Sequence, residues 1–287
     1  MTTAGRRDEH DAQHPVQAFV PGHVTGFFSV HPHDDPRQAG SRGAGLSLSD
    51  GVTVELHPAD ETAVELDGDT VEFDAVTHTL SALGVTARVV IETPLPVSAG
   101  FGVSGGAALG TALAANARFE LAHTENELVG IAHAAEVEAG TGLGDVVAQA
   151  RGGVSLRVEP GAPGYGVGDG IPVPPTPIEY VSFGGRSTKE IIGGDVETLS
   201  QAGERALSEL LKSPTLSRMM ALSREFAHEA DLLTPPVNTA IETVEETGGE
   251  AAMAMLGETV FALEGGLTDA GYDPEICEID PTGARLV

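Results

Sequence analysis

Several residue types are scarce in this chain of 287 residues. It has no tryptophan, only 4% aromatic residues, two lysines and a single cysteine, Cys277. One cysteine excludes an intramolecular disulfide and a zinc site built on a Cys pair. No stretch approaches the roughly 20 consecutive apolar residues of a membrane span, and the polar N-terminus lacks the apolar core of a signal peptide. We therefore expect a cytoplasmic protein with no membrane partner, its cores built from Val, Leu, Ile and Ala.

Basic residues are also few. The chain has 15 Lys and Arg against 43 Asp and Glu, which gives a formal net charge of −28. Such a surface repels nucleic acid and anionic lipid, because both carry dense negative charge. Acidic tails that bind partners concentrate their charge in blocks, whereas here the acidic residues are scattered. Scattered acidity with little lysine favours a halophilic protein, in which molar salt screens the self-repulsion. The interpretation predicts that the fold loosens at low salt.

Glycine, proline and hydrophobic patterning divide the chain into three parts. Residues 1–14 have no periodicity and read as a disordered tail. A Pro- and Gly-rich run at 160–177, with room for a short strand, connects an N-terminal domain (15–178) to a C-terminal domain (179–287). Strands and helices follow one another without strict alternation, which favours an α+β class over a doubly wound sheet.

The pattern also predicts individual elements. Alternating residues predict strands at 16–20, 23–30, 45–49, 52–57, 87–96 and 154–159, with a loop at 31–45 and a hairpin turn at Ser49-Asp50-Gly51. Unbroken apolar periodicity predicts helices at 73–83, 107–121 and 124–140, the last opened by a capping box of Thr124 and Glu127. In the C-terminal part we expect a strand at 178–185, helices near 195–212, 215–231 and 236–247, and a strand–turn pair at 251–263.

A glycine-rich turn joins a predicted strand to a predicted helix. Residues 100–105 read Gly-Phe-Gly-Val-Ser-Gly. The first amides of a helix have no intrahelical partner and carry partial positive charge, and glycine lets the backbone approach an anion closely. The turn therefore suits a phosphate group, although a tight turn without a ligand remains open. No lysine follows the turn, which excludes a Walker A loop, and no HRD or DFG is present. A Rossmann fingerprint is weak, because Glu120 falls between two helices.

The turn and two further motifs resemble the GHMP kinases. The turn follows Pro94 and Pro96, AFVPGHVTGFF comes before it, and AHAAEVEAGTGLGDVVAQARGG comes after it. The resemblance implies a two-domain GHMP kinase fold. An N-terminal β-α-β two-layer domain would hold the phosphate loop, and a C-terminal ferredoxin-like α/β sandwich would complete the cleft. It also implies ATP as co-substrate, bound by Pro94, Gly100, Gly102, Val103, Ser104, Gly105, Gly106 and Ala107.

Phosphoryl transfer also needs Mg²⁺ and a group that orients the attacking hydroxyl. By resemblance, Ser104 and Glu136 are Mg²⁺ ligands and Asp145 is the catalytic residue. Ser104 and Asp145 have an ordinary alternative as helix N-caps. Glu136 lies in an apolar helix context, where a carboxylate is costly unless it is exposed or meets a cation. Glu138 lies on a different helix face and is expected to be solvated. The turn GTGLGD departs from the usual Ser-Gly-x-Asp pattern, which puts Glu136 in more doubt than Asp145.

Within this group the chain resembles archaeal pantoate kinases after residue 15, in PGHVTGFF, GSRGAG, FGVSGGAAL and GTGLGDVVAQ. That family phosphorylates the 4-hydroxyl of pantoate in coenzyme A biosynthesis. The resemblance implies pantoate contacts from Ser29, His133 and Arg157, and Arg42 is a second carboxylate candidate. A core histidine and a surface arginine are the alternatives for His133 and Arg157. A homodimer is expected only from family habit.

Three questions stay open at this point. The acceptor could instead be homoserine, mevalonate or another small alcohol, and the protein could be a nucleotide-binding regulator without turnover. The C-terminal glycine motif of GHMP kinases is reduced here to Gly257, which puts a direct nucleotide contact there in doubt. The HPHDD segment (residues 31–35) could bind a metal, but a solvated loop is favoured.

Overall fold

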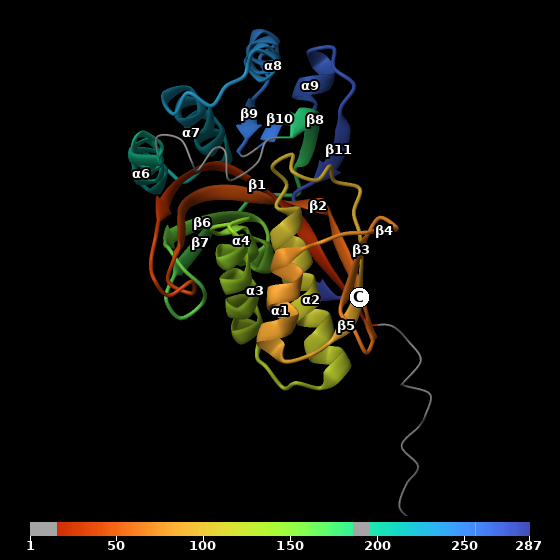
Figure 1. Cartoon of the computed structure of the whole chain (residues 1–287). Coiled ribbons are helices and arrows are strands. Elements are labelled where there is room, and N and C mark those ends of the chain that lie inside the picture. The colour runs from red at the N-terminus through yellow and green to blue at the C-terminus, as the bar shows by residue number, and fades with distance from the viewer. Residues whose placement is uncertain (1–15, 186–195, 256) are drawn as a thin grey trace, which may run out of the picture.

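The computed structural model describes residues 16–185, 196–255 and 257–287, in which two sheets are flanked by helices (Figure 1). The larger, eight-stranded sheet has the path β12-β1-β2-β5-β3-β4, with β6 paired to β2 and β7 paired to β6. Its strands are β1 (Val16–His31), β2 (Gly40–Pro58), β3 (Ala63–Leu66), β4 (Asp69–Thr70), β5 (Ala87–Glu92), β6 (Val154–Glu159), β7 (Val167–Ile171) and β12 (Arg285–Leu286). The smaller sheet has the order β11-β8-β10-β9. It consists of β8 (Pro177–Gly185), β9 (Ala251–Ala254), β10 (Gly257–Leu263) and β11 (Glu275–Glu278).

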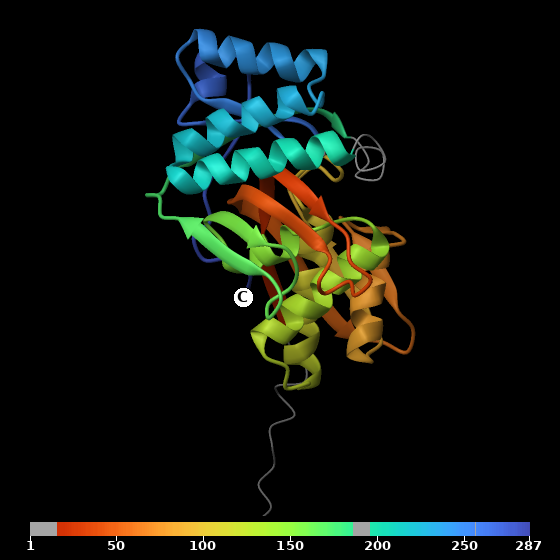
Figure 2. The same cartoon turned by 90° about the vertical axis from the view of Figure 1, so that its left-hand side faces the viewer.

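The helices form separate layers on the two faces of the larger sheet. One face is covered by α1 (Asp74–Leu83), α2 (Val103–Phe119), α3 (Glu125–Ala139) and α4 (Asp145–Arg151). On the other face, α6 (Val196–Lys212) and α7 (Leu216–Glu229) lie side by side over β1, and α7 also contacts β9 of the smaller sheet (Figure 2). Contacts to the smaller sheet are completed by α8 (Pro235–Glu246) and α9 (Gly266–Asp269). The expected α+β class is confirmed.

The helices of the N-terminal part follow the predicted pattern closely. Thr124 and Glu127 form the expected capping box at the start of α3. The first turn of α2 starts earlier than expected, at Val103, because the glycine turn ends in Gly102 with φ of 64° and the chain becomes helical immediately after it. In the Pro- and Gly-rich connection, β7 is the short strand for which the sequence left room.

The predicted hairpin at Ser49-Asp50-Gly51 is wrong, because β2 runs through it as one strand. In the register of β2 with β1, Pro21 pairs with Gly51 and Gly22 pairs with Leu48, so Ser49 and Asp50 form a bulge. In a bulge, one strand contains extra residues that have no partner in the other strand. The sheet bends there, but the strand does not end. Turn residues within an alternating pattern therefore marked a bulge rather than a reversal.

The predicted loop at 31–45 is too long. The strand β2 already begins at Gly40, and residues 40–45 pair with the end of β1, from His31↔Gly40 to Thr25↔Gly45. Their glycines and polar side chains look loop-like in sequence, but this segment is mostly buried between β1 and β6.

The C-terminal end of the chain returns to the larger sheet. Strand β12 pairs with β1, and the Asp280 backbone exchanges hydrogen bonds with Ser47 and Gly153 at 2.9 and 2.7 Å. The N-terminal segment 1–14, predicted to be a tail, lies outside the described residues. Within the described ranges, helices lack the combination of length and apolar character that a membrane crossing requires.

Candidate active site

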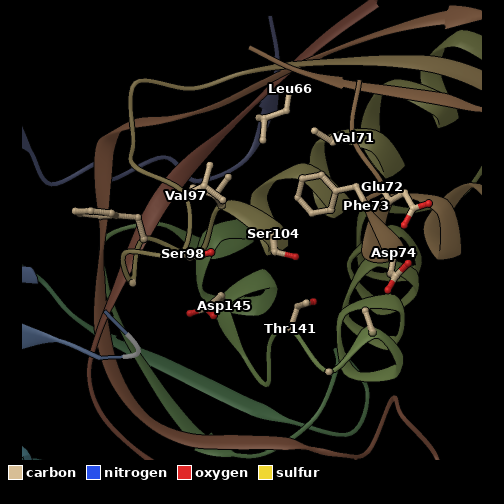
Figure 3. A pocket seen from close by; sticks show the side chains of 16 residues that line it. Leu66, Val71, Glu72, Phe73, Asp74, Val97, Ser98, Ser104, Thr141 and Asp145 are labelled. Atoms are coloured by element: carbon tan, nitrogen blue, oxygen red, sulfur yellow. The ribbon is translucent and has the colours of Figure 1, made fainter. Parts of the chain in front are cut away.

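The glycine turn forms one wall of a cavity of about 500 Å³ beside the N-terminus of α2. Side chains of Ser104, Thr141 and Asp145 surround its inner part, and Leu66 and Val71 lie at its far end (Figure 3). Its apolar lining is completed by Phe73 and Val97. A concave site with an apolar end and a few converging polar groups at a helix N-terminus suits a nucleotide phosphate chain and its base.

Most of the predicted phosphate-binding residues lie at this cavity. Four of them line it, namely Gly100, Gly102, Val103 and Ser104. The next three residues, Gly105, Gly106 and Ala107, are buried in the first turn of α2, so they can contribute backbone amides and close packing but little side-chain surface. Pro94 is exposed and does not line the cavity. The structure therefore assembles the turn and the helix start, and leaves Pro94 outside.

Ser104 and Glu136 meet although they lie on different helices. The Ser104 hydroxyl donates a 2.5 Å hydrogen bond to Glu136 Oε1, and the Thr141 hydroxyl donates to the same oxygen at 2.7 Å. Glu136 is only 2% exposed, and burial raises its pKa to about 7. Glu138, by contrast, is exposed, in agreement with the sequence. Thr141 was not anticipated, although it belongs to the glycine-rich turn that the sequence singled out.

This group of oxygens fits a magnesium ion. Mg²⁺ binds through one or two protein oxygens together with phosphate oxygens and water. A buried carboxylate with a raised pKa lacks a nearby positive charge, and a divalent cation would supply it. The described residues contain no cluster of three His, Cys, Asp or Glu side chains that could hold a metal by itself. A site completed by substrate phosphates agrees with that finding.

Asp145 begins α4 and faces the same cavity. Its Oδ1 accepts a 2.8 Å hydrogen bond from His23 Nδ1 and a 3.4 Å hydrogen bond from the Thr25 hydroxyl. Burial alone would raise the pKa of Asp145, but the His23 hydrogen bond, the charge of Arg157 and the Thr25 hydroxyl together hold it below its ordinary value. Asp145 is therefore a carboxylate at neutral pH, able to accept a hydroxyl proton.

His23 was missed at the sequence level. It is fully buried, and burial lowers its pKa, so the ring is neutral. A neutral imidazole that donates from Nδ1 has a lone pair on Nε2, and His23 Nε2 is buried without a partner among the described residues. The available signal was position, because His23 directly follows the Pro21-Gly22 motif.

Gln149 ties the glycine turn to the first strand. Its Nε2 donates to the carbonyl oxygens of Pro21 at 2.9 Å and Gly102 at 3.0 Å. Gln149 lies one turn after Asp145 on α4, so the same short helix holds both the carboxylate and the phosphate turn. No sequence motif singled out Gln149.

A second cavity, of about 270 Å³, is lined by His133, Arg157 and Ser41 together with Leu143 and Gly144 of the turn before Asp145. Arg157 is 5% exposed, and its Nε donates to the Ser41 hydroxyl at 3.2 Å. His133 is 1% exposed, and its Nε2 donates to the Ala39 carbonyl at 2.8 Å. In the part of the chain that is described, Arg157 Nη1 and His133 Nδ1 are buried without hydrogen-bond partners.

These two unpartnered atoms have different chemistry. Burial lowers the pKa of His133, so a neutral ring that donates from Nε2 offers a lone pair at Nδ1. Arg157 offers an N–H donor and a positive charge. Burying a guanidinium with an unused N–H donor costs free energy, unless a ligand supplies a hydrogen-bond acceptor for that donor. Glu159 also lines the cavity but is exposed, so the two buried groups suit a small anion that also carries a hydroxyl group.

Comparisons with known proteins show the family of the chain. The family model of the GHMP kinases N terminal domain matches residues 71–153. A pantoate kinase of Thermococcus kodakarensis is 36% identical over 86% of this chain and 87% of the relative. A pantoate kinase of Methanocaldococcus jannaschii is 35% identical over 85% of this chain and 91% of the relative. The chain belongs to the pantoate kinase family of GHMP kinases.

Solved structures extend the similarity of this pantoate kinase family member. A structure described as a phosphotransferase related to the CoA biosynthesis pathway aligns with a TM-score of 0.86 and 31% identity over 96% of this chain and 99% of that chain. A homoserine kinase of Cytophaga hutchinsonii aligns with a TM-score of 0.67 at 16% identity over 100% of both chains. At 16% identity, the similarity to the homoserine kinase shows the fold alone. Together with the 31% identical structure, it confirms the expected two-domain GHMP kinase fold.

Two predicted substrate residues of this pantoate kinase family member lie away from the His133 cavity. Ser29 Oγ donates to Glu204 of α6 at 2.6 Å, and Arg42 donates to the other Glu204 oxygen at 2.6 Å. The structure thus brings Ser29 and Arg42 together at Glu204 of α6, but neither lines the cavity that contains His133 and Arg157. Their contact with substrate remains a prediction.

Gly257 packs directly against the phosphate turn. A Cβ at this position would lie 2.1 Å from the Ala99 carbonyl oxygen and 2.9 Å from the Gly100 nitrogen. Without a side chain, Gly257 lets the start of β10 support the turn from behind, and it does not line the 500 Å³ cavity. Gly257, which is what is left of the C-terminal glycine motif in this family member, therefore packs behind the phosphate turn and supports it.

Proposed function

We propose that the protein is an ATP-dependent pantoate kinase, which transfers the γ-phosphate of ATP to the 4-hydroxyl of (R)-pantoate in coenzyme A biosynthesis. The observation that carries the proposal is the pair of unpartnered buried atoms, Arg157 Nη1 and His133 Nδ1, in a small cavity beside the Asp145 turn. Family membership supports the phosphotransfer chemistry, and this pair supports a hydroxy acid as acceptor.

In this proposal the nucleotide occupies the 500 Å³ cavity, with its phosphates against the start of α2. The backbone amides of the first α2 turn bind phosphate oxygens, and the apolar end at Leu66 and Val71 receives the base. Ser104 and Glu136 hold Mg²⁺, which neutralises charge on the phosphates when it is bound. Thr141 keeps the Glu136 carboxylate in place through its 2.7 Å hydrogen bond.

Asp145 orients the acceptor hydroxyl. As the 4-hydroxyl oxygen forms its bond to the γ-phosphorus, the bond from that phosphorus to the bridging oxygen breaks and ADP leaves. The hydroxyl proton passes to Asp145, whose carboxylate is held ionised and in one orientation by the His23 N–H at 2.8 Å. The products are 4-phosphopantoate and ADP.

The acid end of pantoate fits the second cavity. Arg157 Nη1 can donate to the carboxylate, and His133 Nδ1 can accept from the 2-hydroxyl. The charge of Arg157 also disfavours an ammonium group there, as homoserine would present. We further propose a halophilic archaeal protein that works in the cytoplasm, with a homodimer as its assembly.

An acceptor panel tests the proposal. Pantoate, homoserine and mevalonate would be compared with MgATP at molar KCl, measuring ADP formation. We expect kcat/KM for pantoate to exceed kcat/KM for homoserine and for mevalonate by about tenfold or more. A site built to bind a polar group rejects analogues that leave its hydrogen-bonding groups unpaired. Turnover of homoserine or mevalonate equal to that of pantoate would contradict pantoate as the acceptor. If none of the three acceptors is phosphorylated, the result would favour a nucleotide-binding regulator without turnover.

A matched pair of arginine variants locates the carboxylate. Arg157→Gln should raise KM for pantoate by about a hundredfold and leave KM for ATP within about twofold, because it removes a charged hydrogen bond to the acid. Arg88→Gln is the control, since Arg88 pairs with Glu65 on the outer part of the sheet. Similar effects of the two changes would contradict the assigned carboxylate position.

A further inference from the structure

The cavity that contains Arg157 and His133 has an apolar side with no role in binding a carboxylate. Leu143 precedes α4 and Val147 lies in its first turn, on either side of Asp145 in sequence, and both line the cavity. The neighbouring Val146 and Ala148 point into the core and are each 1% exposed, whereas Leu143 and Val147 are only partly buried. Their apolar surface is therefore left facing the cavity.

The opposite wall leaves space for a branched ligand. Glycines occupy much of it, at positions 161, 164, 166 and 168. The glycines leave space beside the apolar ridge of Leu143 and Val147, and Pro163 and Val167 add apolar surface to the lining. The cavity therefore fits an acceptor that is bulky and apolar in its middle and polar at its ends. A linear hydroxy acid would leave that ridge in contact with water.

We infer that Leu143 and Val147 are specificity-determining residues that contact the two methyl groups on C3 of the acceptor, an inference that rests on the proposed function. In pantoate, C3 lies between the carbon that bears the carboxylate and 2-hydroxyl and the carbon that bears the 4-hydroxyl. With the carboxylate at Arg157 and the 4-hydroxyl at Asp145, C3 falls beside α4, where Leu143 and Val147 lie. The site thus selects a 3,3-dimethylated hydroxy acid over its unbranched analogue.

The matching probe is 2,4-dihydroxybutyrate, which has the carboxylate and both hydroxyl groups but lacks the two methyl groups. One missing methylene in an apolar pocket changes kcat/KM by about 10- to 200-fold. We expect wild-type protein to prefer pantoate over 2,4-dihydroxybutyrate by at least about tenfold on that scale.

Val147→Thr is the decisive variant, because it keeps the shape of the side chain and replaces a methyl group by a hydroxyl. It should lower kcat/KM for pantoate by about tenfold and change kcat/KM for 2,4-dihydroxybutyrate by less than about twofold, so that the preference is lost. Val181→Thr, on β8 of the smaller sheet, is the matched control and should leave the ratio of the two substrates unchanged. KM for ATP, measured in both variants, reports an intact nucleotide site.

The outcomes separate the inference from the proposed function. A Val147→Thr protein that keeps the wild-type ratio, or that loses activity equally on both substrates, overturns the inference while the function stands. Val147→Ala provides a second reading, since a wider cavity should also reduce the preference for the methylated substrate. A wild-type protein that phosphorylates neither substrate contradicts the proposed function itself.

Discussion

His23 Nδ1 lies 2.8 Å from Oδ1 of Asp145, although the two residues are separated by 122 positions in the chain. The contact joins the N-terminal motif AFVPGHVTGFF, which contains His23, to the motif that contains the catalytic candidate Asp145. A neutral, fully buried histidine donates a hydrogen bond to a carboxylate and so favours its ionised form.

His23→Leu should therefore weaken the base at low pH. Without this donor, burial dominates and the pKa of Asp145 rises, so the acidic limb of the kcat/KM profile for pantoate moves to higher pH and activity at pH 7 falls by about tenfold to a hundredfold. His23→Asn can place an amide N–H near the former Nδ1 and should restore part of the activity. An unchanged profile in His23→Leu would show that His23 does not set the ionisation of Asp145.

Glu136→Gln tests the buried carboxylate in the absence of Mg²⁺. The pKa of Glu136 is raised from 4.5 to about 7, so the folded protein favours the protonated form and loses stability as pH rises from about 4.5 to about 7. At pH 8 the glutamine variant should be more stable by on the order of 3 kcal/mol, at about 1.4 kcal/mol per pKa unit. Thermal unfolding between pH 5 and pH 8 measures the difference.

Activity provides the second readout for Glu136. The glutamine variant should need at least about tenfold more Mg²⁺ for half-maximal rate, because a charged ligand is lost. Glu138→Gln, two residues further along the same helix and exposed, is the control for both measurements. A stability difference between Glu136→Gln and wild type that does not change from pH 5 to pH 8, or an unchanged Mg²⁺ requirement, would refute the Glu136 assignment.

Gly257→Ala tests the support behind the phosphate turn. The added methyl group would lie 2.1 Å from the Ala99 carbonyl oxygen, so the turn must shift, and misplaced phosphate contacts should lower kcat/KM for ATP by about tenfold to a hundredfold. In the control Gly130→Ala, the nearest atom to the added group is 3.9 Å away. An equal effect of both substitutions would mean that Gly257 has no particular link to the turn.

Salt should stabilise the folded protein strongly. At −28 formal charges, self-repulsion is screened over about 3 Å at 1 M salt but about 10 Å at 0.1 M. We expect the melting temperature to rise steeply between 0.1 and 2 M KCl, and to rise less in sucrose at the same osmolality, because sucrose stabilises folded proteins without screening charge. A melting temperature independent of KCl would argue against the halophilic interpretation.

Local motifs made part of the site predictable from sequence. The glycine turn and the start of α2 are adjacent in the chain, so a strand, a turn and a helix sufficed to place Ser104 at a helix N-terminus. The family resemblance pointed to Glu136 and Asp145, which flank one glycine-rich turn: Asp145 lines the cavity, and Glu136 lies beside it against Ser104. These positions depend on short-range geometry, which residue patterns encode.

The contacts that patterns missed depend on sheet register. His23 reaches Asp145, and Ser41 reaches Arg157, only because β1, β2 and β6 pair in one register beside α4. Ser29 and Arg42 were expected with His133, yet they meet Glu204 across the sheet. Which face a strand residue occupies changes with each bulge, and the bulge at Ser49-Asp50 was itself read as a turn.

The most direct test of the central claim is a paired measurement on Asp145→Asn, which keeps the shape of the side chain and removes its charge. With pantoate and MgATP at molar KCl, we predict that kcat falls by about 10²- to 10⁴-fold, while ATP binding measured by calorimetry stays within about threefold of wild type. Turnover close to that of wild type would contradict a role for Asp145 in phosphoryl transfer to the acceptor hydroxyl.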